Sequence, residues 1–213
     1  MALSVIVFDC DGVLIESVDA KTRAFRRVAE PYGPEAADRL EAYHTENGGV
    51  SRMLKFDWLF AEVLKRPPKQ GEKEELADNF AEYCLDEVLH SAAVPGVLDV
   101  LREWHGRVPL YVASGAPHEE LNDVLQQHGM AHFFEEIYGS PPGKAELLRR
   151  ILIQTGVNPA EAVMVGDSST DLYAAEAARC RFYGRGEYFR HTDYPWHGDL
   201  TRLNAFLREM AGE

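Results

Sequence analysis

The sequence predicts an α/β fold, in which a parallel sheet carries helices on both faces and is interrupted by a helical insertion. Three observations support this prediction. A short apolar run, Val5 to Phe8, ends directly in two aspartates and a glycine. Residues 18–90 then show helical periodicity without a convincing strand. From residue 94 onward, strand-like runs alternate with amphipathic segments, a pattern typical of parallel sheets covered by helices.

Five short apolar runs are bounded by turn residues, as buried strands are. They are residues 5–8, 110–113, 136–138, 162–165 and 181–183. In an open α/β sheet the carboxyl ends of parallel strands form the edge where ligands bind. The polar residues that follow these runs are therefore expected to share one edge.

The insertion carries apolar residues at helical spacing, as in a small bundle. Its predicted helices are residues 21–30, 36–44, 51–64 and 72–89. Five more helices are predicted beyond it, at 97–104, 118–128, 144–156, 171–178 and 200–210. We therefore expect a core domain of residues 1–14 and 94–213, with a helical domain, residues 15–93, inserted after the first strand.

Composition limits the partners of the protein. The 213 residues carry a formal net charge of −13, which argues against the basic footprint of a nucleic-acid binder. No apolar run is long enough for a membrane span, and no basic segment precedes the first strand as in a signal peptide. Cys10, Cys84 and Cys180 are too widely spaced for a zinc site or a disulfide framework. We expect a cytoplasmic protein without nucleic-acid or membrane partners, present as a monomer or weak homodimer.

The strongest signal is the pair Asp9 and Asp11. Side chains two residues apart in an extended chain point the same way, so both carboxylates face one site. Two close carboxylates need a cation or a shared proton. The pair predicts a metal site, or a nucleophile beside an acid and base. Cys10, between them, is expected to point into the core.

Further polar residues follow other predicted strands. Ser114 and Gly115 end the second, Asp167 and Asp171 follow the fourth, and Lys144 opens the helix that precedes the fourth. Each has a structural alternative. Ser114 or Asp167 could cap a helix, Lys144 could lie in a solvated turn, and Asp171 could be an exposed helix-start carboxylate. Their joint occurrence at strand ends favours a single site.

This ordered set resembles the four motifs of the haloacid dehalogenase superfamily of phosphohydrolases. The matching stretches are Asp9 to Leu14, Ala113 to Pro117, Lys144, and Val165 to Asp171. The resemblance extends over nearly the whole chain. It includes a helical cap inserted after the first motif, as in the phosphoglycolate phosphatase and β-phosphoglucomutase group. It implies a Rossmann-like core and specifies the superfamily much better than the substrate.

The resemblance also implies residue roles. Asp9 would be the nucleophile that forms an aspartyl-phosphate, and Asp11 the acid and base. Ser114, Gly115 and Lys144 would hold the transferring phosphoryl group. A magnesium ion would be bound by Asp9, Asp167, the backbone carbonyl of Asp11 and, more remotely, Asp171. The implied activity is Mg²⁺-dependent hydrolysis of a small phosphorylated metabolite, because dehalogenases of the superfamily have no acid at the position of Asp11.

Two other functions remain open. A phosphomutase of the β-phosphoglucomutase type would use the same nucleophile and acid, but it would require a bisphosphate activator. A catalytically silent binding protein would have lost catalytic residues. Asp9, Asp11, Lys144 and Asp167 are all present, which argues against the silent protein.

In the cap, Arg52 and Lys55 follow a glycine turn and share one helix face. They are candidates for binding a second anionic group of the substrate, and the alternative is a solvated helix face. His44 and Glu16 are weaker candidates in the cap, and we expect His44 at the surface and Glu16 in a hinge. His191 and His197, in a segment we could not assign, are expected to be surface residues.

Overall fold

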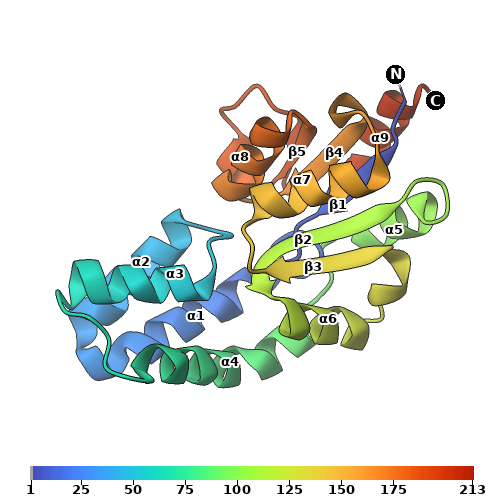
Figure 1. The fold of residues 1–213 in the computed structure, drawn as a ribbon. Helices are drawn as coiled ribbons and strands as arrows, with labels where there is room; N and C mark the ends of the chain where they lie inside the picture. The colour runs from blue at the N-terminus through green and yellow to red at the C-terminus, as the bar shows by residue number, and fades with distance from the viewer. Residues whose placement is uncertain (1) are drawn as a thin grey trace.

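The computed structural model describes residues 2–213, and its centre is a six-stranded parallel sheet in the order β3-β2-β1-β4-β5-β6 (Figure 1). The strands are β1 (Val5–Phe8), β2 (Leu110–Pro117), β3 (Glu136–Ser140), β4 (Ala162–Gly166), β5 (Arg181–Arg185) and β6 (Trp196–His197). Strand β1 lies in the middle, between β2 and β4, and all four of its residues are fully buried. The predicted α/β fold with a parallel sheet is confirmed.

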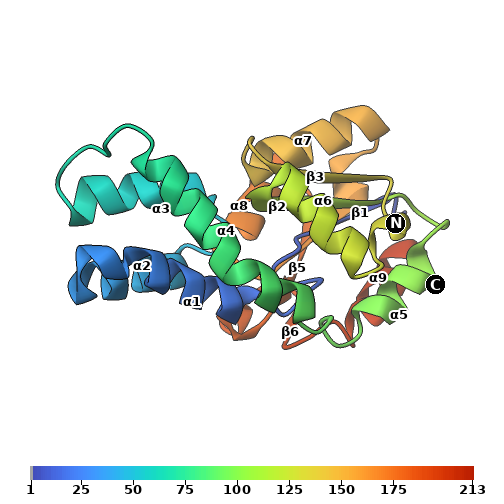
Figure 2. The same ribbon diagram turned by 90° about the horizontal axis from the view of Figure 1, so that it is seen from below.

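Helices cover both faces of the sheet (Figures 1 and 2). Val5 and Val7 of β1 pack in one apolar cluster with residues of α7 (Lys144–Thr155) and α8 (Ser169–Ala178). Ile6 and Phe8 belong to a second cluster on the other face. That cluster contains residues of α5 (Val97–Trp104), α6 (His118–Gln127) and α9 (Leu203–Ala211). The alternation along β1 therefore follows from side chains pointing to opposite faces of a strand.

Four α-helices of the described chain lie between β1 and α5 in the sequence and to one side of the sheet (Figure 1). They are α1 (Val18–Ala29), α2 (Pro34–Glu46), α3 (Arg52–Trp58) and α4 (Glu72–His90). Helix α1 packs against α2 and α4, and a π-helical turn, Leu59–Val63, continues α3. The ring of Phe25 lies 4.3 Å from that of Phe80 and 5.9 Å from that of Phe56, so aromatic side chains form the centre of this group. The predicted helices are confirmed, with ends shifted by a few residues.

The chain enters and leaves this helical group through two neighbouring segments. Ile15 forms an antiparallel bridge with Ala93. The amide of Glu16 donates to the carbonyl of Ala92 at 2.9 Å. The four helices are thus connected to the sheet at the carboxyl end of β1. Cys10, beside this connection, is buried in the apolar core as expected.

The segment that the sequence left unassigned contains the edge strand β6. Its two residues, Trp196 and His197, pair with Gly184 and Arg185 of β5. His197 is half-buried, and its Nδ1 lies 2.8 Å from a carboxylate oxygen of Asp199. A two-residue strand has no apolar run, so periodicity could not predict it.

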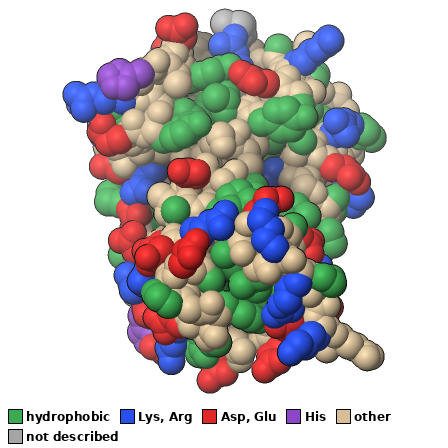
Figure 3. Space-filling model, turned by 90° about the vertical axis from the view of Figure 1, so that its left-hand side faces the viewer, with side chains coloured by type: hydrophobic (Ala, Val, Ile, Leu, Met, Phe, Trp, Pro, Cys, Tyr) green, Lys and Arg blue, Asp and Glu red, His purple; other side chains and the backbone are tan. Residues whose placement is uncertain are grey.

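The surface carries charges of both signs. On the face shown in Figure 3, acidic and basic side chains are interspersed among hydrophobic ones. Among residues 2–213, no helix combines the length and the hydrophobicity needed to span a membrane.

Candidate active site

The predicted site residues meet where β1, β2 and β4 end. Asp9 directly follows β1, and its amide donates to the carbonyl of Val165 in β4 at 2.9 Å. A cavity of about 220 Å³ lies between this edge of the sheet and helices α1 to α4. Its walls include the predicted residues Asp9, Asp11, Arg52, Lys55, Gly115 and Asp167.

Lys144 joins two carboxylates next to the cavity. Its Nζ lies 2.7 Å from Oδ2 of Asp9 and 2.6 Å from Oδ1 of Asp171. All three side chains are buried. Burial lowers the pKa of Lys144, but the charges of Asp171 and Asp9 outweigh it, and the pKa lies above its usual value. Lys144 is therefore a charged member of the site and not part of a solvated turn.

Asp171 has a second contact, which fixes the start of α8. The amide and hydroxyl of Ser168, the N-cap residue of α8, donate to Oδ2 of Asp171 at 3.2 and 2.5 Å. This is a capping box with aspartate in the acidic position. Asp171 is thus a helix-start residue, as one alternative held, but it is fully buried and also bound to Lys144. Asp167 does not cap the helix and lines the cavity instead.

The acidic residues fit a divalent cation. Carboxylate oxygens of Asp9, Asp167 and Asp171 lie within 4.8 Å of one another. Three carboxylates beside one lysine leave two negative charges. Among the described residues, Oδ1 of Asp9 is buried without a hydrogen-bond partner. Burial raises the pKa of both Asp9 and Asp167, and the neighbouring carboxylates raise it further. A hard cation with oxygen ligands such as Mg²⁺ would relieve this repulsion.

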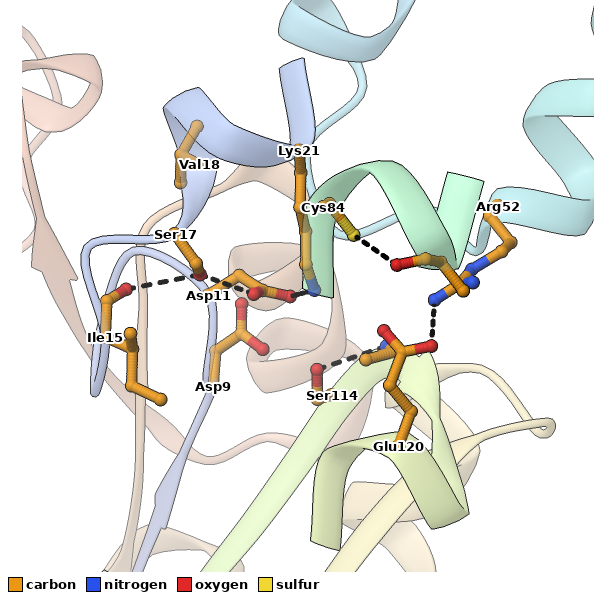
Figure 4. A network of polar contacts seen from close by, with 12 residues as sticks. Asp9, Asp11, Ile15, Ser17, Val18, Lys21, Arg52, Cys84, Ser114 and Glu120 are labelled. Carbon is orange, nitrogen blue, oxygen red and sulfur yellow. Dashed lines mark hydrogen bonds and ion pairs between the residues drawn. The ribbon is translucent and has the colours of Figure 1, made fainter. Parts of the chain in front are cut away.

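Asp11 is held by a different set of residues (Figure 4). Its two carboxylate oxygens accept hydrogen bonds from Oγ of Ser17 and Nζ of Lys21, both at 2.6 Å. Burial raises the pKa of Asp11, but the charge and hydrogen bond of Lys21 outweigh it, and the pKa lies below its usual value. The side chain of Asp11 is not one of the three clustered carboxylates. Its metal contact through the backbone carbonyl stays a prediction.

Ser114 and Gly115 lie in the extended end of β2, which continues to Pro117. The N-cap residue of α6 is Pro117, so Ser114 is not a helix cap. Ser114 is buried, and its Oγ accepts from the amide of Ala116 at 3.2 Å. Gly115 forms part of the cavity wall. Gly115 thus shares the cavity wall with Asp9 and Asp167, and Ser114 directly precedes it in β2.

The loop between α2 and α3 closes the cavity over these residues. Oγ1 of Thr170 in α8 donates to the carbonyl of Gly48 at 3.0 Å. A Cβ on Gly115 would collide with the carbonyl oxygen of Gly49. The loop and the sheet edge are therefore in direct contact.

Arg52 and Lys55 are both buried and both line the cavity, which excludes the solvated helix face. The guanidinium of Arg52 forms an ion pair with Glu120 of α6 and lies 4.6 Å from the ring centre of Phe80. Nζ of Lys55 lies 2.7 Å from Nδ1 of His44. His44 is only 8% exposed, so its expected surface position is wrong. The helix α2 on which it lies turns it toward α3.

Three residues of the site escaped the sequence analysis, Ser17, Lys21 and Glu120, and a fourth, His44, was expected at the surface. The only signal for Ser17 and Lys21 is their position in the first turns after the Asp9–Asp11 motif. His44 and Glu120 contact residues on other helices, and nothing in their local sequence indicates this. Glu16, the expected hinge residue, pairs with Arg185 of β5 at 2.5 Å.

Comparisons with known proteins agree with this geometry. The family described as haloacid dehalogenase-like hydrolase matches residues 3–179. A phosphoglycolate phosphatase of Vibrio cholerae is 30% identical over 200 residues, covering 89% of this chain and 87% of the relative. A fructose-1-phosphate phosphatase of Escherichia coli is 24% identical, with 81% and 91% covered.

Among solved structures, a β-phosphoglucomutase from Clostridium difficile shares the fold. Its TM-score is 0.80 at 20% identity, with 100% of this chain and 98% of that chain covered. The predicted enzyme class, a phosphatase, agrees with the curated relatives. The chain belongs to the haloacid dehalogenase-like hydrolases.

Proposed function

We propose that this enzyme is a Mg²⁺-dependent phosphatase that hydrolyses a small phosphorylated metabolite through an aspartyl-phosphate on Asp9. One observation carries this proposal. Asp9 lines the cavity with one carboxylate oxygen bound to Lys144, while its other oxygen lacks a hydrogen-bond partner among the described residues. A carboxylate held this way has an oxygen free to attack.

The reaction has two steps. In the first, an oxygen of Asp9 attacks phosphorus, the bond from phosphorus to the leaving oxygen breaks, and Asp11 gives that oxygen a proton. In the second, Asp11 takes a proton from water, whose oxygen attacks phosphorus and releases Asp9 and inorganic phosphate. Two displacements replace one difficult displacement. The lowered pKa of Asp11 keeps its side chain ionised, as it must be to accept a proton from water, and the first step requires Asp11 to take up a proton beforehand.

The remaining residues hold the transferring group. Oγ of Ser114 and the amide of Gly115 would donate to the phosphoryl oxygens, and the ammonium of Lys144 would neutralise part of their charge. Preorganised donors of this kind supply much of the rate enhancement in phosphoryl transfer. Asp9, Asp167, the backbone carbonyl of Asp11 and, more remotely, Asp171 would hold Mg²⁺. When bound, the ion neutralises charge on the carboxylates and on the phosphoryl oxygens.

The proposal includes two domains. A core of residues 1–14 and 94–213 carries the catalytic residues, and residues 15–93 form a cap over it. The paired linkers at Ile15 and Ala93 would allow the cap to open for substrate entry. In the structure the cap contacts the core through Thr170 with Gly48 and through Arg52 with Glu120. Arg52 remains a candidate for substrate binding, although its charge is already paired. The closed cap would shield the aspartyl-phosphate from bulk water.

A screen of small phosphate esters with Mg²⁺, measuring released phosphate, tests the function. The relatives suggest phosphoglycolate and fructose 1-phosphate as the first substrates. Asp9→Asn should lower kcat by more than about three decades, because the nucleophile is lost without a change in volume. Asp86→Asn, an exposed cap residue, is the matched control and should retain full activity.

Retention of a tenth of the activity in Asp9→Asn would contradict the nucleophile assignment. Dependence on a bisphosphate activator, with isomerised sugar phosphate as product, would identify the enzyme as a mutase.

A further inference from the structure

The cap contains a buried lysine without an acidic partner. Lys55 lines the cavity, and the residue is 1% exposed. No carboxylate of residues 2–213 lies within ion-pair distance of it. The other two lysines at the site are paired, Lys21 with Asp11 and Lys144 with Asp9. A buried charge without a counter-ion is costly, so an anion from outside the protein is the natural partner of Lys55.

His44 fixes the direction of this lysine. Nδ1 of His44 lies 2.7 Å from Nζ, and the imidazole is 4.5 Å from the ring centre of Phe25. Nζ itself is 4.9 Å from the same ring. The pKa of His44 is lowered to about 3, mainly because the residue is buried and next because the charge of Lys55 is near. His44 is therefore neutral and accepts a hydrogen bond from Lys55. An ammonium that donates once to His44 has two N–H groups left for a ligand.

We propose that Lys55, positioned by His44, binds a carboxylate on the leaving group, so that the substrate is a phosphorylated hydroxycarboxylic acid. This rests on the proposed phosphatase function and names its substrate class. The cavity holds about 220 Å³, which suits a small molecule with its phosphoryl group at Asp9. Because Glu120 neutralises Arg52, Lys55 is the one unpaired cation among the described residues that line the cavity. A single cation matches one carboxylate better than a second phosphate.

A neutral polyol is a poorer match. Its hydroxyl groups could accept from Lys55, but the charge would remain buried and unpaired. A carboxylate provides charge and two acceptor oxygens together. Substrates whose leaving group carries a carboxylate are therefore predicted to have a much higher kcat/KM than substrates whose leaving group lacks one.

The experiment compares phosphoglycolate with 2-hydroxyethyl phosphate, in which a hydroxymethyl group replaces the carboxylate. The wild-type enzyme should prefer phosphoglycolate by about 10- to 100-fold in kcat/KM. Lys55→Met should abolish most of this preference, because phosphoglycolate slows far more than 2-hydroxyethyl phosphate. His44→Asn should reduce the preference partly, again through a larger loss on phosphoglycolate than on 2-hydroxyethyl phosphate. Lys69→Met, an exposed cap lysine, is the matched control and should behave as wild type.

An aryl phosphate separates this inference from the proposed function. If the wild type hydrolyses the aryl phosphate but shows no preference for phosphoglycolate, the carboxylate site is refuted while the phosphatase stands. Equal losses on all three substrates in Lys55→Met would also refute it, because they indicate a structural role. If the wild type hydrolyses none of the three, the phosphatase proposal itself fails.

Discussion

At the scale of single residues, the site depends on three lysines with different partners. Lys144 joins Asp9 to Asp171, and Lys21 holds Asp11. Among the described residues, the ammonium of Lys55 has a neutral histidine, His44, as its hydrogen-bond partner and no carboxylate. The acidic partners of Lys21 and Lys144 favour the charged forms of these two lysines. The pKa of Lys55, in contrast, is lowered to about 7, mainly because the residue is buried and next because the charge of Lys21 is near. In the proposed mechanism the same residue type would therefore serve three purposes: charge stabilisation, positioning of an acid and base, and binding of an external anion.

The role of Asp11 predicts a dependence on the leaving group. Asp11→Asn should lower kcat by about 10²- to 10⁴-fold on alkyl phosphates, whose leaving oxygen needs a proton. An aryl phosphate, with its better leaving group, should lose much less. Steady-state kinetics on both esters checks this, with Asp19→Asn at an exposed position of α1 as the control. Equal losses on both esters would exclude Asp11 as the acid.

Lys55 predicts a pH effect specific to carboxylate substrates. Its pKa of about 7 means that the charged form prevails below pH 7 and disappears above it. Asp11 and Asp167 act to raise this pKa, and Lys21 and Lys144 to lower it, while His44 stays neutral.

The kcat/KM ratio of phosphoglycolate to 2-hydroxyethyl phosphate should therefore fall as the pH rises through 7. Taking the ratio cancels titrations that affect both substrates alike. In Lys55→Met the ratio should not change with pH, and a fall in this variant would assign the effect to another group.

At the scale of elements, the loop between α2 and α3 connects the four inserted helices to the sheet edge where the proposed site lies. Gly49 has a φ of +75°, which favours glycine, and it faces Thr170 and Lys144. Gly48, Gly49 and Val50 of this loop line the cavity, and the carbonyl of Gly48 accepts a hydrogen bond from Thr170 of α8.

Gly49→Ala should therefore hinder closure of the cap. The new Cβ would overlap Oγ1 of Thr170 and lie 2.8 Å from Nζ of Lys144. An added cost of about 1.4 kcal/mol for closure lowers kcat/KM tenfold on every substrate. Gly71→Ala is the matched control, because Gly71 also has a positive φ but no atom within 4 Å of the added Cβ. Equal activities of the two variants, measured on one substrate, would show that the close approach is unimportant.

At the scale of the whole molecule, charge is distributed unevenly. The chain has a formal net charge of −13, and three carboxylates are concentrated at the carboxyl edge of one sheet. Lys144 offsets only one of these three negative charges, so their mutual repulsion destabilises the folded protein unless a metal cation binds beside them.

Mg²⁺ should consequently raise the Tm, because it binds the folded state. At one hundred times its Kd the free energy of unfolding rises by about 2.7 kcal/mol, or roughly 5–10 °C in Tm for a chain of this size. Calorimetry with and without Mg²⁺ measures this directly. Asp167→Asn should lose the increase, while Asp86→Asn should keep it. If Mg²⁺ does not change the Tm of the wild-type protein, the proposed metal site is refuted.

Much of the fold could be predicted because its signals are local. Buried parallel strands such as Val5–Phe8 read as apolar runs, and the helices show their periodicity. The edge strand Trp196–His197 could not be predicted, since its stability comes from pairing with β5.

The sequence by itself determined the fold class, the family motifs and the identity of Asp9, Asp11, Lys144 and Asp167 as one predicted site, because these residues follow apolar strands in a fixed order. Only the tertiary structure decided which charges are paired. It brought Glu120 to Arg52 and Lys21 to Asp11, and it buried His44 against Lys55. These contacts join different elements, and the energy of a buried charge depends on neighbours that local sequence does not specify.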